Sequence, residues 1–165
     1  MFDTIFGLPV HPLVVHATVV FVPLAAVSIL LAAIWPRFRR WAGFLPLAIG
    51  LIGLALVPIS TSSGESVEER VGESALVEKH AELGEGLLPW LIVLVVAALV
   101  LLWIHRGERR GQDRAPKRLL IVGVAVIALV GAVGTSVQTA RIGHSGAEAT
   151  WSDVTASSSG VELDD

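Results

Sequence analysis

Histidines carry the chemistry that this sequence suggests. His11 and His16 lie at the start of the first apolar segment, His80 lies just before the third, and His144 lies just after the fourth. Imidazole is an axial ligand of haem iron and a common ligand of copper, zinc and non-haem iron. Because the helices of one bundle bring residues of equal depth together, we expect these side chains to gather at one side of a membrane.

The surroundings of each histidine rank the candidates. His16 stands one helical turn inside an apolar segment, where an ionisable side chain costs free energy unless it has a partner. His144 lies between Gly143 and Ser145-Gly146, and glycines let the backbone approach another group closely. We therefore predict His16 and His144 as the first-choice ligand pair, with His11 and His80 serving a second site or supporting the first.

Two cations and one more histidine complete the list of candidates. Arg141 and Lys79 stand at the expected water boundary, where they could bind the carboxylates of a cofactor. His105 stands beside Arg106 at the opposite side, and we interpret it as a side chain that reaches towards the lipid headgroups.

Four apolar blocks must position these residues. They cover residues 13–35, 42–60, 87–104 and 119–140 in a chain that is 53% hydrophobic. Each has about the 20 residues that a helix needs to cross a bilayer. We predict an all-α fold, an integral membrane four-helix up-and-down bundle that forms one domain over residues 1–151. A short amphipathic helix near residues 73–83 is expected to carry His80, and the Ser-rich acidic tail 152–165 is expected to be disordered.

The charges predict the orientation of the bundle. Arginines and one lysine crowd the loops 36–41 and 105–118, whereas the other side is rich in acids. Short basic loops stay in the cytoplasm, so both termini are expected outside. The net charge of −3 hides this asymmetry and gives no reason to expect a nucleic-acid partner. The lipid bilayer is the partner that the sequence indicates most directly.

The sequence lacks the residues and motifs of several other classes of protein. The chain has no cysteine, which excludes disulfides, iron–sulfur clusters and covalently attached c-type haem. No phosphate-binding glycine loop, dinucleotide fingerprint or nucleophile elbow is present. The sequence therefore favours a binding protein or an electron carrier over an enzyme.

Two motifs resemble those of a known family. The opening HPLVVH (residues 11–16) resembles the HPLLVHFP signature of an uncharacterised family of small bacterial four-helix membrane proteins, and GHSG (143–146) resembles its closing motif. His80 also matches a central histidine of that family. The family is usually grouped with b-type transmembrane cytochromes, so the resemblance implies a four-helix fold in a bacterial plasma membrane and suggests haem.

Three functions follow as hypotheses. The first is binding of b-type haem near the outer membrane face, for electron transfer or redox sensing, with a quinone or a redox protein as partner. The second is a non-haem site in which three or four imidazoles bind copper, zinc or iron. The third is a structural or accessory membrane subunit without a cofactor, in which the histidines pair polar groups between helices.

Overall fold

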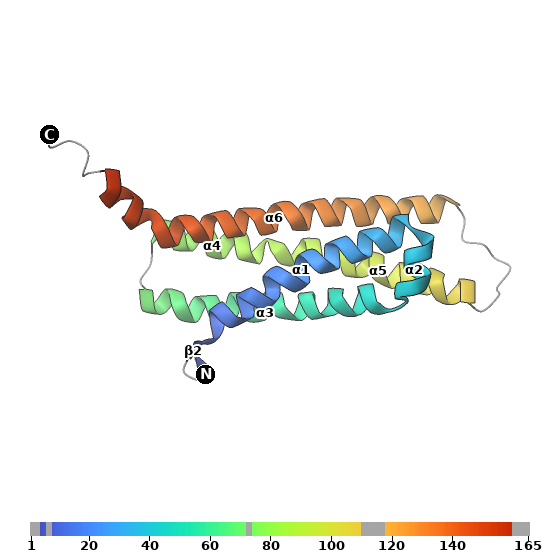
Figure 1. Cartoon of the computed structure of the whole chain (residues 1–165), viewed down its shortest axis with the longest axis horizontal. Coiled ribbons are helices and arrows are strands. Elements are labelled where there is room, and N and C mark those ends of the chain that lie inside the picture. Colours follow the sequence, from blue (N-terminus) through green and yellow to red (C-terminus); the bar gives the residue numbers. More distant parts are fainter. Residues whose placement is uncertain (1–3, 6–7, 72–73, 110–117, 160–165) are drawn as a thin grey trace.

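The computed structural model describes residues 4–5, 8–71, 74–109 and 118–159. Four long helices run up and down the molecule (Figure 1), namely α1 (Val10–Ile34), α3 (Leu45–Val71), α5 (Leu87–Arg109) and α6 (Arg118–Ser159). The short helices α2 (Pro36–Ala42) and α4 (Ala75–Glu85) lie between them, and the strands β1 (Thr4–Ile5) and β2 (Leu8–Pro9) pair antiparallel ahead of α1. The predicted all-α four-helix bundle is confirmed.

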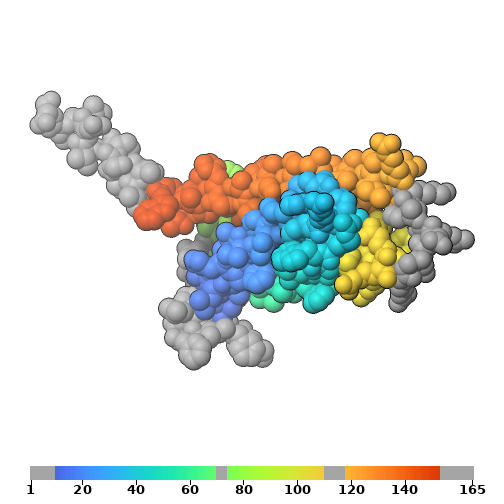
Figure 2. All heavy atoms as spheres, turned by 45° about the vertical axis from the view of Figure 1, so that its right-hand side comes forward, coloured from blue at the N-terminus to red at the C-terminus, as the bar shows by residue number. Residues whose placement is uncertain are grey.

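Neighbours in the chain are neighbours in the bundle. Helix α1 packs against α3 and α6, and α5 packs against the same two helices. Figure 2 shows the side chains of α1 and α6 meeting along one face, where the first and last long helices close the bundle. This is the simple up-and-down arrangement that short connections permit.

The outer surface of the bundle is apolar. All four long helices contain stretches long and apolar enough to cross a membrane. Many large apolar side chains on these helices are exposed, including Val19, Val20, Val96, Val126 and Val130. A water-soluble bundle would turn charged residues outwards instead. Exposed apolar side chains along helices of this length are suited to lipid contact.

Small residues let the helices approach closely in the core. Alanines are buried in three of the long helices, among them Ala25, Ala26, Ala97, Ala98 and Ala128. In α6, a Cβ atom built on Gly134 would lie 2.2 Å from Cε3 of Trp90 in α5. Small residues at such crossings allow dense packing, which drives helix association in lipid.

Two helices continue beyond their predicted ends. Helix α3 includes Pro58 and runs to Val71, although we expected the second span to stop near residue 60. Helix α6 runs to Ser159, so the tail predicted to be disordered from residue 152 is helical over its first part. No proline or glycine occurs in residues 147–159, so nothing in the sequence breaks the helix there. Residues 160–165 lie outside the described part of the chain.

The bundle has two chemically different ends. We call the end at which α1 begins and at which α3 and α6 end the histidine end, and the opposite end, which carries α2, the arginine end (Figure 1). The predicted short amphipathic helix is confirmed as α4, which begins at the N-cap Ser74. The Ser74 hydroxyl accepts a hydrogen bond from the Val77 amide (3.3 Å). Gln138 of α6 donates to the Leu83 carbonyl (2.6 Å), which fixes the last turn of α4.

Candidate functional site

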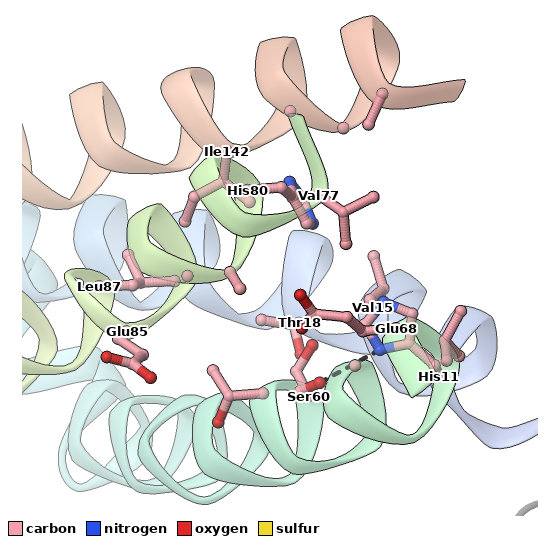
Figure 3. A pocket seen from close by; sticks show the side chains of 18 of the residues that line it. His11, Val15, Thr18, Ser60, Glu68, Val77, His80, Glu85, Leu87 and Ile142 are labelled. Carbon is pink, nitrogen blue, oxygen red and sulfur yellow. Dashed lines mark hydrogen bonds between the residues drawn. The ribbon is translucent and has the colours of Figure 1, made fainter. Parts of the chain in front are cut away.

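A large cavity lies at the histidine end. Its volume is about 1090 Å³, and α1, α3, α4 and α6 all contribute side chains to it. This volume is at the upper end of the range that small-molecule and cofactor sites occupy. The walls are largely apolar (Figure 3) and include Val15, Val19, Val22, Val57, Leu76, Val77, Leu87 and Ile142. The cavity therefore has the size and surface that suit a large apolar ligand.

His11 enters this cavity from the first turn of α1. Its Nδ1 atom lies 3.1 Å from the Ser60 carbonyl oxygen and 3.1 Å from Ser63 Oγ, both in α3. The Ser63 hydroxyl itself donates to the Ser60 carbonyl (2.9 Å), so its oxygen is an acceptor towards the ring. Two acceptors therefore face His11 Nδ1, which makes this nitrogen the donor.

His80 enters the same cavity from α4. Its Nδ1 atom lies 3.0 Å from Ser145 Oγ in α6, and the Ser145 hydroxyl donates to the Ile142 carbonyl (3.0 Å). With its hydrogen on the Ile142 carbonyl, Ser145 Oγ is free to accept from the Nδ1–H of His80. Each of the two histidines is thus held by a serine of another helix.

The Ser60 carbonyl can only accept, so it makes Nδ1 the donor of His11, and the bond from Ser145 to the Ile142 carbonyl favours the same tautomer for His80. A neutral imidazole that donates from Nδ1 has its lone pair on Nε2. Within the described residues, neither Nε2 atom has a hydrogen-bond partner. A donated Nδ1–H and a free Nε2 are the arrangement in which histidine binds iron and other metals in proteins. The cavity thus presents two imidazoles that are prepared to act as ligands.

A glycine supports each ring. A Cβ atom built on Gly64 of α3 would lie 3.2 Å from His11 Cε1, and one built on Gly146 of α6 would lie 3.1 Å from His80 Cε1. Both glycines directly follow the serines that accept the Nδ1–H bonds. A larger residue at either position would force the ring to shift from its place.

The predicted first-choice pair lies elsewhere. His16 is exposed, and its Nδ1 donates to the Pro12 carbonyl of its own helix. The side chain of His144 is 77% exposed, and its Nε2 lies 3.2 Å from Glu148 Oε1 of its own helix. Neither residue lines the cavity. The structure therefore brings together His11 and His80, and it does not bring together His16 and His144.

The two predicted cations also lie outside the cavity. Lys79 Nζ pairs with Glu148 Oε2 at 3.1 Å, and both side chains are exposed. Arg141 is exposed on α6. Neither lines the cavity, whose charged lining side chains, apart from the histidines, are the acids Glu65, Glu68 and Glu85 within the described residues. The geometry thus supports no contact between these two cations and a ligand in the cavity.

A site of three or more metal-binding side chains is not preformed. Among the residues that the structure describes, no group of three or more His, Cys, Asp or Glu side chains is placed to hold a metal ion. The cavity instead offers two imidazoles on different helices. Two is the number of axial ligands that a six-coordinate haem iron takes.

Comparison with protein families gives one match over most of the chain. Residues 7–159 match the family described as "Predicted membrane protein (DUF2231)". The chain belongs to this family. Comparisons with curated proteins and with solved structures gave no match. Both histidines of the cavity and both supporting serines fall within the part that matches DUF2231.

This DUF2231 protein has a second polar cluster, at the arginine end. Arg39 of α2 is 3% exposed and donates to the Ala32 carbonyl (3.1 Å) and to Glu108 Oε1 (2.9 Å). His105 of α5 is 5% exposed. We expected this histidine to reach towards the headgroups, and that interpretation is wrong because the ring is buried. Arg39 ties the end of α1 to α5, so the cluster has a structural role.

Sequence reasoning missed the serines and glycines of the site. Ser63-Gly64 and Ser145-Gly146 form the same dipeptide near the histidine ends of α3 and α6. From the sequence we considered only the second dipeptide, because His144 directly precedes it. The repeated Ser-Gly pair could have indicated these two positions. The glycine leaves space for an imidazole ring, and the serine hydroxyl provides its hydrogen-bond partner.

Proposed function

We propose that this membrane protein binds b-type haem in the cavity at the histidine end, with His11 and His80 as the axial ligands. The bound haem would supply one-electron redox chemistry for electron transfer or redox sensing. The single observation that carries the proposal is the pair of imidazoles that line one cavity, each hydrogen-bonded through Nδ1 and each without a partner at Nε2 among the described residues.

The residues around the two histidines have defined tasks in this proposal. Ser63 and the Ser60 carbonyl hold the His11 ring, and Ser145 holds the His80 ring. These bonds fix the orientation of the rings. Apolar residues such as Val15 and Val77 line the space between α1 and α4 and would limit water around the ligand.

The side of the membrane is part of the same proposal. We place the histidine end outside and the basic segments 36–41, which lies in α2, and 105–118 in the cytoplasm of a bacterial plasma membrane. The support is the concentration of arginine in these short segments. A quinone in the membrane, or a redox protein at its outer surface, is the proposed electron partner.

The absorption spectrum of the purified protein tests the proposal. A b-type cytochrome gives a sharp Soret band and an α-band on reduction. We expect His11→Ala and His80→Ala each to lower haem occupancy at least tenfold, because each removes one axial ligand. His16→Ala and His144→Ala are the matched controls, and both should keep the wild-type spectrum, since neither ring lines the cavity.

Other spectra would support other functions. A colourless protein that contains stoichiometric copper, zinc or iron would replace haem with the non-haem metal hypothesis. A colourless protein without metal, whose assembly does not depend on His11 or His80, would leave the accessory subunit. A spectrum lost only in the His16→Ala and His144→Ala variants would overturn the assignment of the ligands.

A further inference from the structure

We propose that Glu68 lowers the reduction potential of the haem held by His11 and His80. This inference rests on the proposed function and concerns a residue that the ligand assignment does not use. Glu68 lies on α3, the helix that holds the His11 ring, and it lines the same cavity.

The position of Glu68 follows from helix geometry. Ser60, Gly64 and Glu68 are spaced four residues apart, so they lie in one row on the same face of α3. Ser60 accepts from His11, and Gly64 lies against the ring. Figure 3 shows the Glu68 side chain at the same side of the cavity as His11 and Val15. The Glu68 side chain therefore belongs to the same helix wall of the cavity that holds one of the two proposed ligands.

Glu68 has no compensating partner among the described residues. Neither a hydrogen bond nor an ion pair joins it to any of them. It is half-buried, whereas Glu65 and Glu85, the other acids of the lining, are exposed. A half-buried charge is screened by water and salt less than an exposed one. Of the three acids, Glu68 thus acts most strongly on a charge inside the cavity.

The sign of the effect follows from the charge of the centre. The core formed by ferric iron and the doubly negative porphyrin carries one positive charge, and reduction to ferrous iron makes it neutral. A nearby carboxylate stabilises the positive form and does not stabilise the neutral one. Glu68 therefore favours ferric haem.

Potentiometric titration of the purified haem protein tests this inference. Glu68→Gln removes the negative charge and should increase the ferrous-to-ferric ratio at a fixed potential about tenfold. This corresponds to a rise of about 59 mV in the reduction potential of the haem. Glu69→Gln is the matched control, because Glu69 is the exposed neighbour on α3 and does not line the cavity. It should change the ratio less than twofold.

The outcomes separate this inference from the proposed function. The role of Glu68 would be overturned by equal shifts of the reduction potential in the two variants, or by no shift in Glu68→Gln. The assignment of His11 and His80 would stand in that case if the haem spectrum were unchanged. A wild-type protein without haem would overturn both the role of Glu68 and the proposed function. If Glu68→Gln does not accumulate, Glu68→Ser removes the same charge and must give the same rise.

Discussion

At the scale of single residues, the two serines are not equivalent, and this difference can be measured. His11 has two acceptors, the Ser60 carbonyl and Ser63 Oγ, whereas Ser145 Oγ is the acceptor for His80 among the described residues. We predict that Ser145→Ala weakens haem binding on the order of tenfold, the lower end of the usual effect of losing a partner of a ligating histidine. Ser63→Ala should weaken it less, because the backbone carbonyl remains. Haem titration of the apo-protein measures both.

An exposed serine on the same helix provides the control for this experiment. Ser136 of α6 is exposed and does not line the cavity. Ser136→Ala should therefore bind haem like the wild type. If Ser63→Ala proved more damaging than Ser145→Ala, the assignment of hydrogen-bond partners to the two rings would be wrong.

The choice between neighbouring histidines also belongs to the residue scale. His11 and His16 are five residues apart, which places them about 140° apart around a helix axis. Only one of them can face the bundle interior. The sequence placed His11 and His16 together near the start of one helix, but it ranked His16 first because of its apolar neighbours. The end of the bundle was predictable, whereas the direction of each ring depended on how α1 is rotated against α3.

At the scale of elements, the length of α3 decides whether the site exists. The polar run that begins with Ser60-Thr61-Ser62-Ser63 suggested that the second span ends there. Helix α3 instead continues to Val71, and this extension supplies Gly64 and Glu68 to the cavity and Ser63 to the His11 ring. Polarity marks where a helix leaves lipid, but it does not mark where the helix ends. The wall that holds His11 could not be predicted for this reason.

Close packing between α5 and α6 gives a prediction about stability. Gly134→Ala should destabilise the bundle by about 1–3 kcal/mol or more, because its Cβ would lie 2.2 Å from the Trp90 ring. Gly123→Ala is the matched control on the same helix, since, apart from the neighbouring backbone of α6, no atom of the described residues lies within 4 Å of a Cβ built there. Alanine also favours helix more than glycine does, so this control should be neutral or stabilising. Thermal unfolding in detergent measures both, and equal midpoints would contradict the packing described.

At the scale of the whole molecule, the architecture was the most predictable part. Four apolar blocks with short connections determine a bundle of four antiparallel helices, because each block must bury its backbone polar groups within itself in lipid. Both the number of spans and the short helix α4 agree with this expectation. Contacts between helices far apart in the sequence, such as that of His80 with Ser145, depend on rotations that hydropathy does not encode.

The orientation of the molecule leads to the last prediction, and the composition makes it easy to test. The chain has no cysteine, so a single introduced thiol reports its own location. With the positive-inside rule, Glu69→Cys at the histidine end should react with a membrane-impermeant maleimide added to intact cells. Gln112→Cys, in the segment that connects α5 to α6, should react only after the cells are opened. The reverse pattern would place the cavity at the cytoplasmic face, where soluble cytoplasmic reductants rather than extracellular proteins would have access to the proposed haem.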